Sequence, residues 1–544
     1  MQKASLYIKI GFTWAFLFTL ICAMAQKKIK LEPGAGKLSG FRKDGVNYTI
    51  VTGNVKFTHK GTIFFCDSAV LVKKTNYLDA YGHVRILDGD SVTVTSKTLH
   101  YDGDNKIARM RQNVVLTKLG QMRLYTDFLD YDRNTSIASY FDSGKIVDTT
   151  NVLTSQKGYF NTRTNFASFK TRVVGTNEDK TLRSDTLVYN TQTGIVYFVA
   201  PTEITDKEGN VFNYSEGTYN TKVKSSNLDK GIAETESYYL RGDQMVLDDI
   251  RGHYTAIGNV YMLSKNDDII ITGQKAIMDK KSQITKVFDM PLLKMINTKD
   301  TLYLTADTLV SIDSEEDINK RLLAYSNVKI FKKDLKGICD SIAYFVSDSI
   351  MFLYGNPALW SGENQMTADT IDMVIRNKSL YKMDLFPGAF VVTSDSAQYY
   401  NQIKGRSMEA WFTDEELSQV NVYGNGESIF FMRDEKTAKL IGMNKIICSD
   451  IVLQFKGRKL TDASFLVKPE GDFIPPHELK DNDTRLNGFV WRGDERPLKS
   501  ELLENELKVD LTLEPQKEID AVPIKLEKGP NPLKRPPVKR NLKN

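Results

Sequence analysis

The sequence predicts an all-β protein built as a long stack of short strands, in repeats of about 30 residues. Two short sequence boxes recur in a fixed order along most of the chain. The segments between them alternate apolar and polar residues and are rich in Val, Ile, Thr, Tyr and Phe, which is typical of strands. Turn-forming pairs such as Asp102-Gly103 separate these segments.

The first residues predict a secretory leader. Lys3 and Lys9 precede an apolar run from Phe12 to Ala25, which ends in an Ala-x-Ala site. The run has about 14 residues, whereas a membrane-spanning helix needs roughly 20. We therefore expect residues 1–25 to be a signal peptide and the mature chain to begin at Gln26 in the periplasm, with association with the outer membrane left open. An uncleaved membrane anchor is the alternative.

The first repeated box consists of a small residue, Asp, Ser or Thr, and an aliphatic residue. Its copies are Cys66-Asp67-Ser68-Ala69, Ser184-Asp185-Thr186-Leu187, Ala306-Asp307-Thr308-Leu309, Cys339-Asp340-Ser341-Ile342, Ala368-Asp369-Thr370-Ile371 and Ser394-Asp395-Ser396-Ala397, with a divergent Thr126-Asp127-Phe128-Leu129. A catalytic site is used once, whereas these aspartates recur with the repeat. We interpret them as structural carboxylates that accept hydrogen bonds from backbone donors at a strand corner.

The second box follows the first by some 15 to 20 residues and ends in Gly/Ser-Asn-Val or a relative of it. Its copies are Gly53-Asn54-Val55, Gly82-His83-Val84, Gln112-Asn113-Val114, Gly258-Asn259-Val260 and Ser326-Asn327-Val328, with weaker forms at Gly355-Asn356-Pro357 and Gly424-Asn425-Gly426. Between the boxes, a Leu-x-Tyr-Asp/Asn motif recurs at 99–102, 129–132 and 187–190. These boxes punctuate a regular series of strands.

The pattern divides the chain into a leader and four segments. They are an N-terminal linker at 26–44, repeats at 45–235, further repeats at 236–465, and an irregular C-terminal segment at 466–544 that holds a short helix and a basic, Pro-rich disordered tail. Only Thr413 to Gln419 and Pro497 to Leu507 predict helix.

Charge and cysteine usage exclude several classes of protein. The net charge is +5, the leader carries +2 and residues 525–544 carry +6, so residues 26–524 carry −3. A nearly neutral body argues against a nucleic-acid surface. Cys22 follows Ile21 rather than a small residue, which disfavours a lipoprotein. The three remaining cysteines do not form a disulfide framework, and we expect them to be small core residues. They are Cys66, Cys339 and Cys448.

No pattern of catalytic or metal-binding residues emerges. The five histidines are scattered, so we expect neither a metal site nor a cofactor. Carboxylate doublets could suggest acid–base work on a glycan, but they lie among turn residues and favour solvated loop charge. They are Asp248-Asp249, Asp267-Asp268, Glu315-Glu316 and Glu415-Glu416. We expect that the protein is not an enzyme.

The order of the boxes resembles the OstA-like (organic solvent tolerance) family, which includes LptA-type periplasmic lipopolysaccharide-transport proteins. The likeness is strongest from 45 to 135 and recurs at 180–200 and 240–400. It implies an elongated, repetitive open β-jelly roll of stacked antiparallel strands, whose apolar interior shields the acyl chains of lipopolysaccharide. This chain, a long form of the kind expected in Bacteroidota, departs from the family by exceeding a single such domain.

The resemblance also implies a function and partners. The protein would be a periplasmic lipopolysaccharide-binding bridge or adaptor, taking part in lipopolysaccharide transport to the outer membrane and in outer-membrane assembly. It would join LptD-like outer-membrane and LptC-like inner-membrane proteins by end-to-end sheet pairing. Two alternatives remain open: an exported parallel β-helix enzyme or adhesin that acts on polysaccharide, and an inert envelope scaffold.

Strand parity predicts which side chains face the interior. After each second box the apolar residues occupy every second position. Because successive side chains of a strand point to opposite faces, these residues should share one face. The predicted lipid-binding, interior-facing residues are Val55, Phe57, Val84, Ile86, Val114, Leu116, Val260, Met262, Val328 and Ile330. The intervening Lys56, Arg85, Val115, Tyr261 and Lys329 should face solvent. A closed, packed core is the alternative to a lipid groove.

Overall fold

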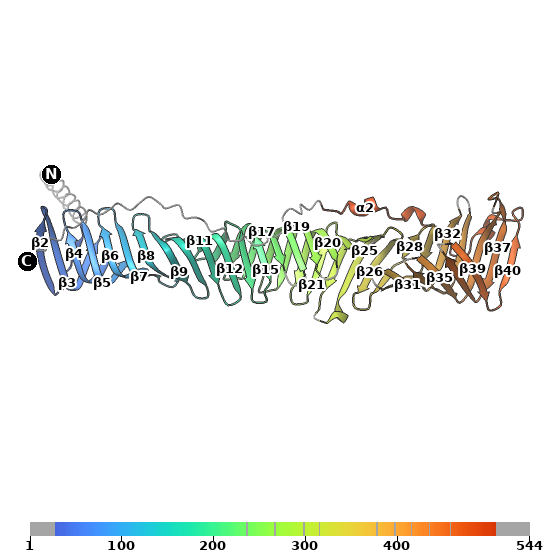
Figure 1. Ribbon diagram of the computed structural model, residues 1–544, viewed down its shortest axis with the longest axis horizontal. Coiled ribbons are helices and arrows are strands. Elements are labelled where there is room, and N and C mark those ends of the chain that lie inside the picture. Colours follow the sequence, from blue (N-terminus) through green and yellow to red (C-terminus); the bar gives the residue numbers. More distant parts are fainter. Residues whose placement is uncertain are drawn as a thin grey trace, which may run out of the picture. The chain divides into compact units, whose positions relative to one another are not determined.

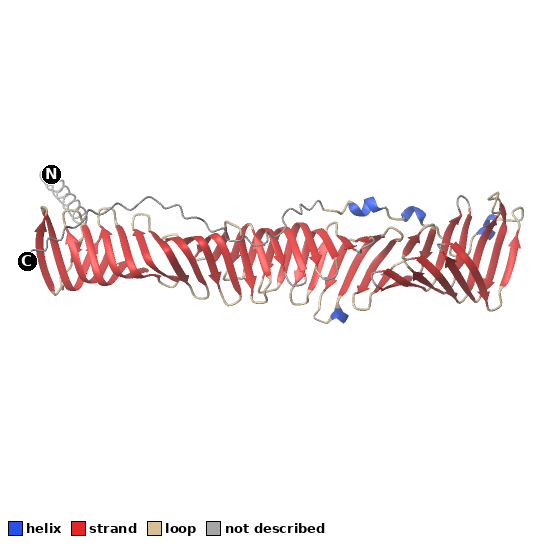
Figure 2. Ribbon diagram, in the orientation of Figure 1, coloured by secondary structure: helices blue, strands red, loops and turns tan. Residues whose placement is uncertain are grey.

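The computed structural model describes residues 28–507, except for 235–237, 266–267, 297–299, 315, 377–378, 396–398, 415, 435 and 457–458. The predicted leader and basic tail lie outside these residues. Within them, 40 strands form one sheet whose pairings are all antiparallel, and most of the chain is strand (Figures 1 and 2). This confirms the predicted fold class. It contradicts the parallel β-helix alternative.

The N-terminal region consists mainly of long strands. They are β1 (Lys30–Leu31), β2 (Lys37–Lys43), β3 (Val46–His59), β4 (Thr62–Val72), β5 (Tyr77–Asp88), β6 (Val92–Asp102), β7 (Ile107–Lys118), β8 (Met122–Asp132), β9 (Ile137–Val147), β10 (Val152–Asn161), β11 (Phe166–Thr176) and β12 (Lys180–Asn190). From β2 onward each pairs with the next in sequence, whereas the short β1 pairs with β3.

The middle region mixes short and long strands. They are β13 (Ile195–Phe198), β14 (Thr202–Asp206), β15 (Val211–Tyr214), β16 (Glu216–Asn220), β17 (Ser225–Glu234), β18 (Tyr238–Asp248), β19 (His253–Ser264), β20 (Ile269–Asp279), β21 (Ile284–Phe288), β22 (Leu292–Ile296), β23 (Thr301–Thr305), β24 (Thr308–Ile312), β25 (Arg321–Phe331) and β26 (Lys336–Phe345), with the 3₁₀ turn η1 (Asp317–Asn319) between β24 and β25.

The C-terminal region consists of shorter strands throughout. They are β27 (Ile350–Tyr354), β28 (Ala358–Ser361), β29 (Asn364–Thr367), β30 (Thr370–Arg376), β31 (Ser379–Phe386), β32 (Phe390–Asp395), β33 (Tyr399–Lys404), β34 (Ser407–Thr413), β35 (Glu416–Tyr423), β36 (Gly426–Arg433), β37 (Leu440–Cys448), β38 (Asp450–Lys456), β39 (Lys459–Leu466) and β40 (Glu470–Ile474). After them come η2 (Asp481–Thr484), η3 (Gly493–Glu495) and α2 (Lys499–Leu503).

Many of the long strands bend near the middle, at a corner where the second box forms a two-residue bulge. In β5, Gly82 and His83 have φ values of 73° and 36°, and the register with β4 shifts beside them. Gly and Asn tolerate this left-handed backbone better than other residues. Asp67 of the first box lies across the corner, where its Oδ2 is 2.8 Å from Nδ1 of His83. At the equivalent corner of β7, Asp127 accepts a hydrogen bond of 2.8 Å from the backbone N–H of Asn113. The aspartate of these boxes is therefore a corner residue, as predicted, but the copy at Asp395 is not, because Asp395 ends β32 and pairs with Tyr399 across the hairpin to β33.

The bend gives the sheet two arms, one on each side of the corner line. The arms enclose an apolar core that includes Val51 near one end and Leu453 near the other. The turns at the free margins of the two arms face each other, and we call the line between them the seam. One row of turns includes 60–61, 89–91, 119–121, 148–151, 177–179 and 207–210. The opposite row includes 103–106, 133–136, 162–165, 191–194, 221–224, 249–252 and 280–283.

Proline marks places where a bent strand becomes two separate strands. Between residues 34 and 474 the chain has five prolines at corners, which are Pro201, Pro291, Pro357, Pro387 and Pro469. Each lies between two short strands: β13 and β14, β21 and β22, β27 and β28, β31 and β32, or β39 and β40. Proline has no backbone N–H for the ladder, so the strand is interrupted there. The strand next to such a break is either divided as well or remains whole and pairs with both pieces. For example, β12 is whole and pairs with both β13 and β14.

A C-terminal segment covers the outside of one arm. Residues 475–507, which we call the strap, leave β40 and pass back along the stack, so that α2 contacts β23 and β25 (Figure 1). A second apolar cluster lies beneath the strap and includes Phe390, Phe431 and Leu486. None of the helices in the described residues is long and apolar enough to span a bilayer.

Three sequence-based boundaries need correction. Residues 26–44 were expected to be a linker, but Lys37–Lys43 forms β2, because its backbone pairs along the first half of β3. The helix predicted at 413–419 is a hairpin between β34 and β35, whose strand pairing overrides local helix propensity. The sheet also extends past residue 465 through β40, which pairs with β37. The helix predicted within 497–507 is α2.

Candidate functional site

The ten predicted interior residues all lie in the core between the arms. Met262 is 7% exposed and the other nine are 0–1% exposed. Of the intervening residues, Arg85 is exposed and the others are half-buried. Neighbouring side chains therefore fill the interior at the nine positions, and lipid contact at the ten residues stays a prediction.

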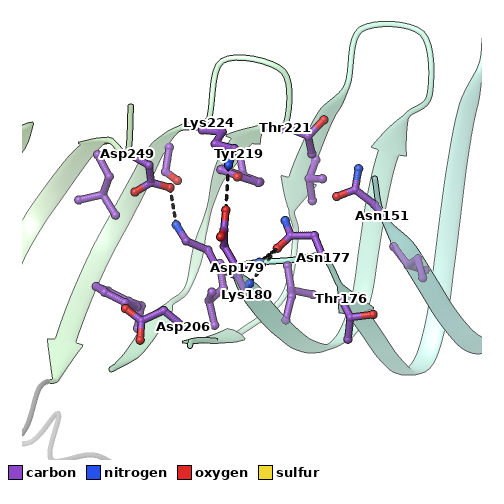
Figure 3. A pocket seen from close by; sticks show the side chains of 18 of the residues that line it. Asn151, Thr176, Asn177, Asp179, Lys180, Asp206, Tyr219, Thr221, Lys224 and Asp249 are labelled. Atoms are coloured by element: carbon purple, nitrogen blue, oxygen red, sulfur yellow. Dashed lines mark hydrogen bonds and ion pairs between the residues drawn. The ribbon is translucent and has the colours of Figure 1, made fainter. Parts of the chain in front are cut away.

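A cavity of about 290 Å³ lies between the two arms (Figure 3). Its lining residues run from Ile146 in β9 to Lys280, the first residue after β20. This volume is near the lower end of the range for small-molecule sites, roughly 300–1,000 Å³. Its wall is mostly apolar and is formed by residues of both arms. The apolar and aromatic lining residues are Ile146, Val152, Leu153, Leu182, Leu187, Tyr189, Val196, Ile204, Phe212, Tyr214, Tyr219, Leu247 and Tyr254. The ten predicted residues do not include any of these.

The cavity coincides with the first interrupted strands. β13 and β14 are separated at Pro201, and β15 and β16 are separated at Ser215. Six of the lining residues come from these short strands: Val196, Ile204, Asp206, Phe212, Tyr214 and Tyr219. The proline was visible in the sequence, but the volume depends on how side chains from many strands fill the space between the arms.

Ion pairs cross the seam at the mouth of the cavity. Lys180 pairs with Asp249 of the opposite turn row, and Lys224 donates to Asp179 with 2.8 Å between Nζ and Oδ2 (Figure 3). Beyond them, Lys280 Nζ lies 3.2 Å from Oε2 of Glu208. The hydrogen bond and charge of Lys224, with a smaller contribution from Lys207, hold the pKa of Asp179 below its usual value. Asp249 was expected to be solvated loop charge as part of a doublet, but its side chain is only 16% exposed.

Tyrosines occupy the boundary between the apolar wall and the charged mouth. Tyr189 donates to Asp148 at 2.6 Å, and Tyr254 donates to Asp249 at 3.1 Å. Burial raises the pKa of Tyr219 to about 12 and raises those of Tyr189 and Tyr254 still further. These phenols are therefore neutral at physiological pH. The site presents an apolar interior with hydrogen-bonding groups at one side, which suits a ligand with an apolar chain.

The seam is also closed over the N-terminal region, but by a more buried polar network. Arg133 reaches across to Asp88 at 3.1 Å and to the hydroxyl of Tyr101 at 3.2 Å. Tyr101 also contacts Nδ1 of His59 at 2.7 Å, and Tyr131 donates to Asp88 at 2.8 Å. Burial would raise the pKa of Asp88, but the hydrogen bond from Thr62 and the charge of Arg133 outweigh it, and the pKa is lowered.

Other reactive groups do not form a site in the part of the chain that the structure describes. No group of three or more His, Cys, Asp or Glu side chains there could hold a metal ion. Cys66, Cys339 and Cys448 are buried and unbridged, as expected. Burial raises the pKa of the Cys66 thiol to about 11 and that of Cys339 to about 12, so neither is a ready nucleophile.

The match to a protein-family model agrees with the sequence resemblance in the N-terminal region. Residues 26–185 match the family model described as OstA-like protein. Among solved structures, a similar chain is LptH of Pseudomonas aeruginosa, described as the LptA homologous periplasmic component of the conserved lipopolysaccharide transport device. The two are 15% identical, the match covers 22% of this chain and 82% of that chain, and the TM-score is 0.19. No curated protein matches the sequence.

Proposed function

We propose that this chain, whose residues 26–185 are OstA-like, is an exported lipopolysaccharide-binding bridge or adaptor that takes part in lipopolysaccharide transport to the outer membrane. The observation that carries the proposal is the apolar cavity between the arms, which lies inside a continuous antiparallel stack. Such a site needs no catalytic group. The family match supports the class of function, and the cavity supports the class of ligand.

Burial of an acyl chain would provide the affinity. Each methylene group transferred from water to an apolar site contributes about 0.8 kcal/mol, before the cost of ordering the chain. The cavity is small, so it accommodates part of an acyl chain rather than a whole lipid. The neighbouring core at Leu116 and Val260, both 0% exposed, would have to open for more of the lipid to enter.

The two ends of the stack support end-to-end pairing with partners. β2 pairs only with β3, and β40 pairs only with β37 among the described strands, so each has a free edge. Free edges can add a strand from another protein. The β2 segment carries Lys37, Arg42 and Lys43, whereas β40 carries Glu470 and Asp472. We expect an LptC-like inner-membrane partner and an LptD-like outer-membrane partner to pair with these opposite ends.

Photo-crosslinking in cells tests the proposal. A crosslinking amino acid at Ile204 or Phe212, which line the cavity, should capture lipopolysaccharide. The matched control is Glu203, which neighbours Ile204 on β14 but pairs outside with Arg183 at 3.7 Å. A crosslinker at Ile86, in the packed core, tests whether lipid also passes through the N-terminal region. Equal capture at Ile204 and Glu203, or capture at neither, would contradict lipid binding in the cavity; the second outcome favours the inert scaffold.

A further inference from the structure

The two arms are joined very differently along their two margins. At the corner they are joined by the strands and by the hydrogen-bonded ladder between them, as in the continuous pairing of β17 with β18. At the seam, the cross-row bonds found near the cavity come mainly from side chains. Opening the seam therefore breaks only these contacts, whereas parting the strands would break the backbone ladder as well.

The seam is weakest where it passes over the cavity. In the N-terminal network, Arg133 and Asp88 have side-chain exposures of 10% and 20%. Over the cavity, Lys224 and Asp179 are 50% and 35% exposed, and Lys280 and Glu208 are 45% and 48% exposed. Ion pairs that are this exposed contribute little stability and are screened by salt. Only the pair of Lys180 and Asp249 is more buried there.

The packed core blocks the route from either end of the stack. On the N-terminal side, Leu116 and Leu124 are 0% exposed, and on the other side Val260 is 0% exposed. An acyl chain that travelled lengthwise to the cavity would have to displace these side chains from a close-packed core. A chain that entered across the seam would displace only three ion pairs and their turns.

We propose that the seam between turns 177–179 and 207–210 on one side and 221–224, 249–252 and 280–283 on the other is a lateral gate, through which an acyl chain enters the cavity. This inference rests on the proposed function, because it assumes that the cavity takes lipid. Three ion pairs close the gate and separate when it opens: Lys180 with Asp249, Lys224 with Asp179, and Lys280 with Glu208.

Crosslinking across the gate provides the test. In the full chain, Lys280→Cys and Glu208→Cys are combined and joined with a short bis-maleimide. Cys66, Cys339 and Cys448 are buried, so they should not react, and Cys22 belongs to the predicted leader. The probe is a 14-carbon fatty acid that carries an environment-sensitive fluorophore. We expect joining the two cysteines to slow probe uptake at least tenfold relative to the same variant capped with a monofunctional maleimide.

A matched control ties two turns of the same row. Lys222 donates to the backbone oxygen of Gln192 at 2.6 Å, and both lie on one side of the seam. Joining Lys222→Cys to Gln192→Cys should leave the uptake rate unchanged. Equal uptake by the crosslinked and capped Lys280→Cys/Glu208→Cys protein would overturn the gate, while leaving lipid binding intact. If no variant and not even the unmodified protein binds the probe, the proposed function fails and the gate fails with it.

Charge reversal gives an independent measurement. Lys224→Glu places two like charges across the seam and should speed probe uptake several-fold. Combining it with Asp179→Lys restores an opposite pair and should return the rate to that of the unmodified protein. If the double variant stays as fast as Lys224→Glu alone, the pair does not hold the gate and the assignment of these residues is overturned.

Discussion

The N-terminal and C-terminal regions use the same sequence boxes to build two different kinds of wall. In residues 46–190 the strands are continuous across the corner, and the chain has no proline. In residues 350–474 nearly every strand is divided there, and the halves belong to two series of pairings, such as β31–β34–β35–β38 and β32–β33–β36–β37. The boxes therefore specify where the sheet turns. The residues within the corner decide whether the ladder continues through it.

The regions also differ in what stabilises them from outside the core. The N-terminal region is closed at the seam by the network of Arg133 and Asp88. The C-terminal region has one arm covered by the strap, and two fully buried glutamines of that arm bind its backbone. Gln402 donates to the oxygen of Thr484 at 2.8 Å and accepts from the N–H of Leu486 at 2.9 Å. Gln365 bonds to Val490 and Arg492 in the same manner.

The largest expected effect is a charge in the N-terminal core. Val84→Asp buries an unpaired carboxylate at a position that is 1% exposed, so it should lower the free energy of unfolding by more than about 3 kcal/mol. Chemical denaturation measures the change. The control is Arg85→Asp on the exposed face of the same strand, which should cost less than about 1 kcal/mol. Similar losses of stability in the two variants would contradict the assignment of Val84 to the interior and Arg85 to the outer face of β5.

A smaller effect is expected where the strap meets the C-terminal region. Gln402→Leu leaves a buried carbonyl and a buried N–H of the strap unpaired, which should cost about 2–4 kcal/mol. Limited proteolysis should then cut within 475–507 while the N-terminal region stays intact. Gln454→Leu, on an exposed side of β38, is the control. Unchanged protection of the strap would show that the glutamines do not hold it.

The stabilities of the two regions should change in opposite directions with pH. Burial, and the charge of Asp384 on the next strand, raise the pKa of Asp372 to about 6. Because the folded state then binds the proton more tightly than the unfolded state, stability rises as the pH falls from 7 to about 5. Solvent screening limits the gain to about 1–2 kcal/mol. The lowered pKa of Asp88 implies that its contribution is instead lost on acidification.

Two variants separate these contributions. Asp372→Asn should stabilise the C-terminal region at pH 7 and remove its gain near pH 5, whereas Asp88→Asn should destabilise the N-terminal region mainly at pH 7. Hydrogen exchange of each region at the two pH values is the measurement. A gain near pH 5 that persists in Asp372→Asn would assign the effect to another group.

The smallest expected effect concerns a single corner. Asn113 has φ of 52° in the bulge of β7, a conformation that a β-branched residue adopts only with strain. Asn113→Val should therefore cost about 1–2 kcal/mol, whereas Asn113→Gly should change stability by a few tenths. Thermal unfolding of both variants tests this. Equal stability of the Val and Gly variants would mean that the bulge is not retained.

Sequence reasoning succeeded where a short-range period decides the structure. The parity of residues such as Val84 and Ile86 follows from the two-residue repeat of a strand, and both are buried. The helix expected at 413–419 failed because Glu and Leu favour helix locally, but the pairing of β34 with β35 decides the outcome. The cavity was missed because it depends on the combined volume of side chains from many strands. Pro201 was its one local signal.

The strap also changes how the stack should come apart. In a linear repeat array each unit contacts only its neighbours, so the array can fray one unit at a time from its ends. The strap violates this rule, since Lys294 pairs with Glu506 and Lys329 pairs with Glu501 at 2.9 Å, although β40 lies between them in the sequence. Unfolding that begins at β40 would have to release contacts as far back as β22. Residues from about 290 to 507 should therefore unfold as one cooperative unit. A nascent chain that ends before the strap lacks these contacts, so its last strands should be less stable than in the complete sheet.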